Sequence, residues 1–212
     1  LSAYAKAGLK LSPKKCNFFR SEITFLGHTL NASGIKPIGS YVQSILNWKL
    51  PVTKSAARAF LGVTGYYRQF IKDYSAIAAP WTDVIGKTDA VSERRPLVVS
   101  TDMISAFEKL RVALTTAPVL GFPYFHGQKC GQFTLDTDFS KNQIGAVLSQ
   151  RQGNQETVIA YGSKKLSKTQ QNWHATKGEM YAGIHFMRTY AYFLQFGPAF
   201  RWRTDNSALS HS

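Results

Sequence analysis

The stretch FTLDTDFSKNQIGAVLSQ, residues 133–150, decides the fold class of this 212-residue chain. Its first part alternates apolar and polar residues, which predicts a strand over 133–138. Its second part is apolar on both faces, which predicts a central strand over 143–150. Asp138 lies between the two strands, where the chain turns among apolar neighbours. That carboxylate needs a partner, because isolated charge is costly in a low-dielectric interior.

The residues after this stretch extend the same sheet. A third strand is predicted over 156–163, after the polar turn RQGNQ. A long helix is predicted from about Thr169 to Phe196, and a last strand follows in FRWRTD, residues 200–205. The order is strand, strand, strand, helix, strand. If the fourth strand pairs beside the first, the acids that end these two strands share one sheet edge.

Glu179 is the unusual residue of the predicted helix. At helical spacing its neighbours include Ala182 and Phe186, which belong to a packed face rather than a solvated one. The conventional explanation is an ion pair with Lys177 or Arg188, but their offsets along the helix point elsewhere around the cylinder. A partner distant in sequence stays open.

Three acids therefore fall at a strand end, a helix interior and a strand end: Asp138, Glu179 and Asp205. Three converging carboxylates would repel one another, and each would raise the pKa of its neighbours. Magnesium removes that conflict, because hard cations take oxygen ligands and keep positions open for water and phosphate. The pattern predicts a site for two Mg²⁺ ions, with Mn²⁺ as the alternative, that assists phosphoryl displacement.

The composition indicates a polyanionic partner. Lysine and arginine number 26 against 12 aspartates and glutamates, a net charge of +14, which makes nucleic acid the first hypothesis and a merely solvated surface the alternative. Cys16 and Cys130 lack metal-ligand spacing and favour a reducing compartment. No apolar run reaches about 18 residues and no signal peptide is recognised, so we expect an intracellular protein that is neither membrane-bound nor secreted. The first residue, Leu1, suggests a piece of a longer protein.

The sequence before residue 131 predicts a hairpin followed by helices. In chain order, we expect a hairpin over 9–30, a short helix around 42–46 that Pro51 ends, a second helix that starts at Thr53 or Ser55 in a segment ending around Pro80, a polar linker over 82–100, and a helix from Thr101 that ends before Pro118.

Several motifs, taken in order, resemble one family. FTLDTDFSKNQIGAVLSQ, VIAYGSKKL, NWHATKGEMYAGI and FRWRTDN resemble the ribonuclease H domain of gypsy-type LTR retrotransposon and retroviral reverse transcriptases. Upstream, GLKLSPKKCNFF, FLGHTL, GIKP, AFLGVTGYYRQFI and APVLGFP resemble the end of the palm, the primer grip, the thumb and the connection of the same polyproteins. The match spans nearly the whole chain.

The resemblance implies an α+β or α/β fold: a helical thumb with a preceding β-hairpin, then a ribonuclease H-like mixed sheet flanked by helices and truncated after the fourth strand. It divides the chain into the end of the palm with the primer-grip hairpin (1–36), thumb helices (37–81), linker and connection helix (82–130) and a partial ribonuclease H-like domain (131–212). It implies cleavage of the RNA strand of RNA/DNA hybrids with two magnesium ions.

The same resemblance assigns site residues. The catalytic and metal-binding residues are Asp138, Glu179 and Asp205, although Phe139 and Asn206 replace the family's usual alanine and histidine beside them. The implied primer-grip residues are Phe25, Leu26, Gly27 and His28. The candidates for nucleic-acid contact are Lys54, Arg58, Gly62, Gly65, Tyr66, Arg68 and Lys72. The alternative for this last set is ordinary helix packing with exposed basic residues.

Two departures divide the functional hypotheses. The sequence contains no Asp-Asp pair, so polymerisation by this chain alone is not expected, and it ends at Ser212, before the family's fourth metal carboxylate. One hypothesis is a nuclease that receives hybrid from the thumb, alongside the rest of the polyprotein, in cytoplasmic virus-like particles or the nucleus. The other is a truncated or domesticated relic that binds duplex non-specifically without cutting. A dimer is left open, and a carboxylate-pair glycosidase explains neither the charge nor the element order.

Overall fold

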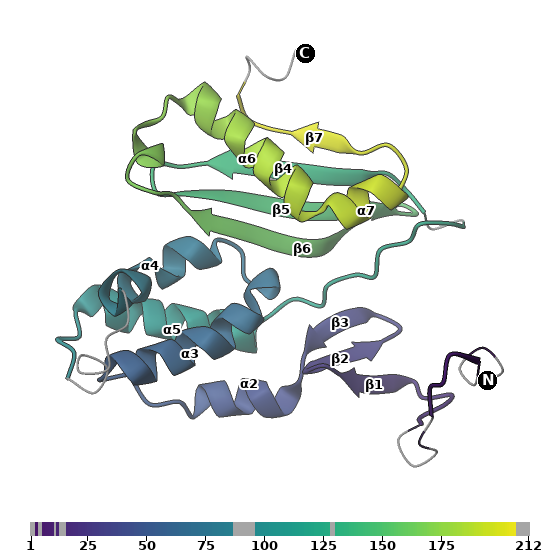
Figure 1. Cartoon of the computed structure of the whole chain (residues 1–212), viewed down its shortest axis with the longest axis horizontal. Helices are drawn as coiled ribbons and strands as arrows, with labels where there is room; N and C mark the ends of the chain where they lie inside the picture. The colour runs from purple at the N-terminus through teal and green to yellow at the C-terminus, as the bar shows by residue number, and fades with distance from the viewer. Residues whose placement is uncertain are drawn as a thin grey trace.

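The computed structural model describes most of the chain, in the ranges 3, 6–10, 12, 16–86, 96–127 and 130–206. Figure 1 shows a small antiparallel sheet near the N-terminus, a group of helices, and a larger sheet covered on one face by helices, which has four strands. Most of the predicted hairpin and linker lies within these ranges, but residues 13–15 and 87–95 lie outside them. The expected α+β fold class is confirmed.

The small sheet has three strands where a hairpin was expected. They are β1 (Glu22–Phe25), β2 (His28–Asn31) and β3 (Gly34–Pro37), paired antiparallel in the order β1-β2-β3. The hairpin prediction over 9–30 was wrong in extent. It counted GIKP as part of a turn, whereas these four residues pair with β2, and on their other side Ile35 exchanges backbone hydrogen bonds with Leu120 (2.7 and 2.9 Å). A contact so distant in sequence leaves no local signal.

The helical part contains α2 (Gly39–Leu46), α3 (Lys54–Tyr66), the 3₁₀ turn η2 (Arg68–Phe70), α4 (Tyr74–Ile85) and α5 (Thr101–Thr115). The predicted N-cap is confirmed, because the Thr53 hydroxyl accepts from the backbone N–H of Ala56 (3.2 Å). Phe60, Phe107 and other buried apolar side chains from these helices form one core.

Helix α4 continues past Pro80, where the sequence predicted an end. Its last turn carries buried Trp81 and Ile85, and the Trp81 indole N–H donates to the backbone carbonyl of Met103 on α5 (2.8 Å). This burial offsets the backbone hydrogen bond that a proline removes from a helix interior. The predicted linker therefore starts later than residue 82.

The four-stranded sheet has the order β6-β5-β4-β7. Its strands are β4 (Phe133–Phe139), β5 (Gln143–Gln152), β6 (Gln155–Lys165) and β7 (Arg201–Arg203). The first three pair antiparallel, and β7 pairs parallel with β4. The sequence predicted these four strands to within two residues at each end, and it predicted the central position of β5. The pairing of the fourth strand beside the first, which was assumed, is observed.

The single helix expected over 169–196 is divided into three pieces. They are the 3₁₀ turn η3 (Gln170–Asn172), α6 (Ala175–Thr189) and α7 (Ala191–Phe196). Trp173 adopts an extended conformation before α6, and buried Tyr190 separates α6 from α7 while stacking on Phe186 (ring centroids 6.1 Å). Both helices lie across the same face of the sheet (Figure 1).

The helical part packs along β6, the outer strand of the sheet (Figure 1). The Arg68 guanidinium donates to the backbone carbonyl of Ser163, and the Ser163 hydroxyl accepts from the backbone N–H of Ser75 (2.9 Å). Further along β6, the backbone N–H of Gly121 donates to the carbonyl of Val158 (2.8 Å). Segments far apart in sequence thus cover this strand.

Within the described ranges, no helix combines the length and the apolar character needed to cross a bilayer. Helices α5 and α6 have 15 residues each, fewer than the about 20 that a spanning helix requires.

Candidate functional site

The three acids singled out in the sequence lie together at one edge of the large sheet. Asp138 is near the end of β4, Glu179 is in α6, and Asp205 follows β7. One carboxylate oxygen from each lies within 4.8 Å of the others. The parallel pairing of β7 with β4 produces this convergence, because it brings the carboxyl ends of both strands to the same edge.

Glu179 is held without any basic partner. Its side chain is buried, and its two carboxylate oxygens accept from the backbone N–H of Phe139 (3.0 Å) and from the Thr204 hydroxyl (3.2 Å). Helix α6 approaches β4 closely here, since a Cβ on Gly178 would lie 2.4 Å from the Phe139 ring. The ion pairs considered for Glu179 with Lys177 or Arg188 are not formed.

The environment of the cluster disfavours negative charge in the absence of a cation. Burial, above all, raises the pKa of Glu179 and of Asp138. The charges of Asp205 and Asp73 raise the pKa of Asp138 further, while Lys72 lowers it. Among the described residues, no lysine or arginine forms a salt bridge with the three carboxylates. Three converging carboxylates without a basic partner provide the hard oxygen donors that a divalent cation prefers.

Sequence reasoning missed the groups that surround the cluster. A cavity of about 230 Å³ beside Asp138 is lined by Lys72, Asp73 and Gly145, among others. Asp73 accepts from the Gln143 amide (3.2 Å), so the segment before α4 reaches the sheet beside the acids. No local motif marks Asp73 for this position, and Lys72 was selected only as a candidate for phosphate contact.

Arg203, two residues before Asp205, forms ion pairs with acids outside the cluster. Arg203 on β7 binds Asp136 with two guanidinium nitrogens, one of them at 2.6 Å, and it also reaches Glu156 (3.0 Å). The alternating acids of β4 therefore differ in role, because Asp136 has a cation partner and Asp138 has none within salt-bridge distance in the described structure.

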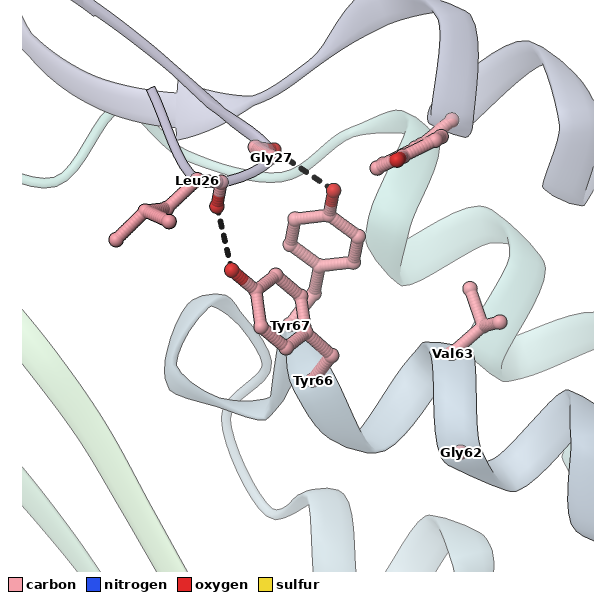
Figure 2. A pocket seen from close by; sticks show the side chains of 7 residues that line it. Leu26, Gly27, Gly62, Val63, Tyr66 and Tyr67 are labelled. Atoms are coloured by element: carbon pink, nitrogen blue, oxygen red, sulfur yellow. Dashed lines mark hydrogen bonds between the residues drawn. The ribbon is translucent and has the colours of Figure 1, made fainter. Parts of the chain in front are cut away.

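The expected primer-grip turn is anchored on the end of α3. The Tyr67 hydroxyl donates to the Gly27 carbonyl (2.7 Å), and the Tyr66 hydroxyl donates to the Leu26 carbonyl (Figure 2). Burial, followed by the neighbouring tyrosines Tyr66 and Tyr41, raises the pKa of Tyr67 to about 12. Tyr67 therefore stays a hydrogen-bond donor throughout the physiological pH range.

A pocket of about 520 Å³ lies beside this turn (Figure 2). Gly62 and Val63 of α3 line it together with the turn and the two tyrosines, and the space around Gly62 is open for 4 Å. Phe25 is largely exposed, and His28 stacks on Phe70 (5.6 Å between ring centroids). The structure thus brings the predicted primer-grip residues beside the predicted thumb residues.

The basic candidates of the thumb divide into two groups. Arg58 donates to the backbone carbonyls of Ile85 (3.2 Å) and Gly86 at the end of α4, and Arg68 donates to β6. Both arginines therefore have contacts inside the protein. Lys54 is half-buried and Lys72 is exposed. Their contact with nucleic acid stays a prediction.

Three antiparallel strands, a helix that carries an acid, and a fourth strand parallel to the first form the arrangement of ribonuclease H-like domains. Residues 99–200 match the family model described as RNase H-like domain found in reverse transcriptase. With the relatives described next, this match shows that the chain belongs to the reverse transcriptase region of gypsy-type retrotransposons.

The similarity to curated relatives extends over almost the whole chain. The Pol polyprotein from transposon 297 of Drosophila melanogaster is 36% identical over 205 residues, which cover 97% of this chain and 18% of the polyprotein. The Pol polyprotein from transposon gypsy of the same organism is 32% identical, with 99% and 20% covered. The chain thus spans about a fifth of the length of these relatives.

Solved structures support the fold. The foamy viral protease-reverse transcriptase dRH in complex with double-stranded DNA has a TM-score of 0.78 at 20% identity, over 99% of this chain and 35% of that one. The same viral protein in complex with an RNA/DNA hybrid has a TM-score of 0.74 at 19% identity, over 91% of this chain and 25% of that one. The helical part and the large sheet both fall within these matches.

Proposed function

We propose that this chain hydrolyses the RNA strand of RNA/DNA hybrids and that its helical part binds the duplex. The observation that carries the proposal is the convergence of Asp138, Glu179 and Asp205 within 4.8 Å. Membership of the reverse transcriptase family supports it, and so do the nucleic acids bound to the similar viral structures.

Asp138, Glu179 and Asp205 would hold the divalent cations, with two Mg²⁺ ions as the proposed cofactor. Bound magnesium would polarise the scissile phosphate and make water a better nucleophile. The fit rests on the donor set, since three carboxylate oxygens converge and burial raises the pKa of two of them. A cation at this place would replace mutual repulsion with attraction.

The chain's own groups would prepare the site before any cation binds. The backbone N–H of Phe139 and the hydroxyl of Thr204 fix both oxygens of Glu179, so its rotamer is set. Exposed Lys72 lies near enough to Asp138 to lower its pKa, and it would attract a phosphate to the cluster. Positioning and electrostatic attraction are thus the contributions of these residues.

The duplex would lie against the primer-grip turn and α3. The residues proposed to contact it are Phe25, Leu26, Gly27, His28, Lys54, Arg58, Gly62, Gly65, Tyr66, Arg68 and Lys72. The functional boundaries expected from the sequence lie after residues 36, 81 and 130, and the second of them falls inside α4, which ends at Ile85. The chain would work with the rest of its polyprotein, in cytoplasmic particles or in the nucleus.

Binding without cleavage is the second candidate function. The observation that favours it is that the metal-ligating group in the described ranges contains three carboxylates and no fourth. The net charge of +14 would still retain a nucleic acid electrostatically. The two candidates make opposite predictions for a cleavage assay.

The test uses the full chain and an RNA/DNA hybrid labelled on the RNA strand, with Mg²⁺ or with EDTA. We expect magnesium-dependent cleavage that Asp138→Asn lowers by at least about a hundredfold, because a metal ligand is lost. The matched control is Asp102→Asn, an exposed aspartate at the start of α5, which should cleave like the wild type. Cleavage that survives Asp138→Asn would refute the nuclease, and salt-sensitive binding without cleavage would establish the second candidate.

A further inference from the structure

A second pocket lies at the junction of the chain's parts, apart from the carboxylate cluster. It has a volume of about 600 Å³ and is lined by η2, by the segment 120–123, by β6 and by the C-terminal part of α6. None of Asp138, Glu179 and Asp205 lines it. A volume of this size lies within the range of small-molecule sites, about 300 to 1,000 Å³.

The ionisable side chains of this pocket include basic residues but no acidic ones. Arg68, Lys164 and His185 line it, and no aspartate or glutamate does. Neither Arg68 nor Lys164 has a salt bridge in the described part of the chain. Neutral groups hold both cations instead, since Arg68 donates to a backbone carbonyl and Lys164 donates to the Tyr181 hydroxyl (2.8 Å). Their positive charge is therefore available to an anion.

Aromatic rings share the pocket with these cations. Tyr161 from β6 lines it, and so do Phe186 of α6, Tyr190 at the end of α6 and Phe193 of α7. Phe186 and Tyr190 stack at 6.1 Å with an interplanar angle of 20°. Phe186 and Tyr190 are buried, so half-buried Tyr161 and Phe193 are the rings that a ligand can meet. Cations beside these rings suit a ligand that combines a phosphate with a flat aromatic group, because guanidinium and ammonium groups bind phosphate and every base has a π-face.

We propose that this pocket binds a nucleoside monophosphate unit, either free or at the 5′ end of a single strand. Arg68 and Lys164 would hold the phosphate, and the aromatic lining would contact the base. An inorganic anion would contact the two cations alone, whereas a base would also contact half-buried Tyr161 and Phe193. The proposal goes beyond hydrolysis of hybrids, because the pocket uses no metal and contains none of the three carboxylates, and it shares only Arg68 with the residues proposed to contact the duplex.

His185 gives the proposal a second, independent readout. Burial, followed by the charges of Lys164 and Arg68, lowers the pKa of His185 and so favours the neutral imidazole. The titratable and charged groups around it are Lys164 and Tyr161 from β6, Arg68 from η2, and Tyr181 and Tyr190 from α6 and its end. A bound phosphate would oppose the field of the two cations. Binding should therefore raise the pKa of His185.

The test titrates the full chain with adenosine 5′-monophosphate in EDTA, which prevents cation-mediated binding at the carboxylate cluster. We expect saturable binding by calorimetry and an upward shift in the NMR titration of the His185 ring, assigned with His185→Gln. Lys164→Gln should weaken binding about tenfold, the effect of one charge-assisted hydrogen bond. The matched control Lys168→Gln removes an exposed lysine outside the pocket and should leave binding unchanged.

Two further arms identify the source of the ligand. A short single strand with a 5′-phosphate should compete with the nucleotide, and the same strand without the phosphate should compete much less. The proposal is overturned if adenosine monophosphate does not saturate, if Lys168→Gln weakens binding as much as Lys164→Gln, or if the His185 titration does not move. Because no arm measures cleavage, failure here leaves the hydrolysis proposal untouched, and the converse also holds.

Discussion

Replacing Glu179 by glutamine should stabilise the cation-free protein and abolish its response to magnesium. The substitution removes a buried negative charge but keeps the shape of the side chain. Its carbonyl oxygen can still accept from Phe139, and its amide can donate to the Thr204 hydroxyl in place of the bond observed there. The variant therefore tests cation binding by the cluster while it keeps the contacts of residue 179 that support the fold.

The magnitude follows from the geometry of the cluster. Two like charges 4.8 Å apart repel by about 3.5 kcal/mol at an effective dielectric constant of about 20, and by about 0.9 kcal/mol in water. Asp138 and Asp205 are exposed, so the lower value applies, and relief of two repulsions gives roughly 2 kcal/mol. Weakening one charged hydrogen bond costs about 1 kcal/mol. The net gain in the free energy of unfolding should be about 1 kcal/mol.

The assay is urea denaturation of wild type and Glu179→Gln, in EDTA and in Mg²⁺. At an ion concentration ten times the dissociation constant, the wild type should gain about 1.4 kcal/mol, and the variant should gain almost nothing. Glu22→Gln is the matched control, because Glu22 is exposed on β1 and distant in sequence from the cluster. It should respond to magnesium like the wild type.

The pH dependence has a definite sign. Because the folded state raises the pKa of Glu179, the folded protein binds this proton more tightly than the unfolded chain does. In EDTA, wild type should therefore lose stability relative to Glu179→Gln as the pH rises above about 4, the ordinary range of a carboxyl group. A variant that is less stable than wild type at pH 8 in EDTA, or that keeps the magnesium response, would refute the reasoning.

Two predictions concern the small sheet and its anchor. Gly34→Ala should destabilise the protein by about 3 kcal/mol in urea denaturation, because Gly34 has φ +135° and a Cβ would lie 2.1 Å from a carbonyl oxygen. Gly39→Ala is the control, because a Cβ at Gly39 would meet no atom within 4 Å, and it should be neutral or slightly stabilising. Equal losses of stability in the two variants would contradict the prediction. Tyr67→Phe should cost about 1 kcal/mol, because it removes one of the two donors to the Gly27 carbonyl and leaves the backbone N–H of Ile38 as the other. Tyr66 is exposed, so Tyr66→Phe should cost less. A larger loss of stability for Tyr66→Phe than for Tyr67→Phe would refute the argument.

The large sheet could be predicted because its signals are local. Alternation over β4, continuous burial over β5 and the position of Glu179 on a packed helical face each appear in a few consecutive residues. Their convergence with Asp205 required only one assumption, the pairing of β7 beside β4. The convergence of the three carboxylates was thus predicted from the sequence, while cation binding and chemistry there stay a proposal.

The remaining features depend on contacts between distant segments. Helix α4 passes Pro80 because Trp81 reaches the carbonyl of Met103, which no local pattern reveals. Leu26 occupies the turn before β2 at φ +45°, although a leucine is no turn signal. The position of Asp73 beside the carboxylates results from packing of the helical part on the sheet.

The hydrogen bonds that other segments make along the outer edge of β6 affect whether copies of this chain can pair through their sheets. An open sheet edge recruits strands from other molecules and starts aggregation. Here the outward carbonyls of Val158 and Ser163 already have donors from Gly121 and Arg68. At the opposite edge, β7 extends for three residues and carries exposed Arg201, whose charge repels an identical partner, while Arg203 is paired with Asp136 and Glu156. The described sheet thus offers little template for intermolecular pairing, even at high local concentration.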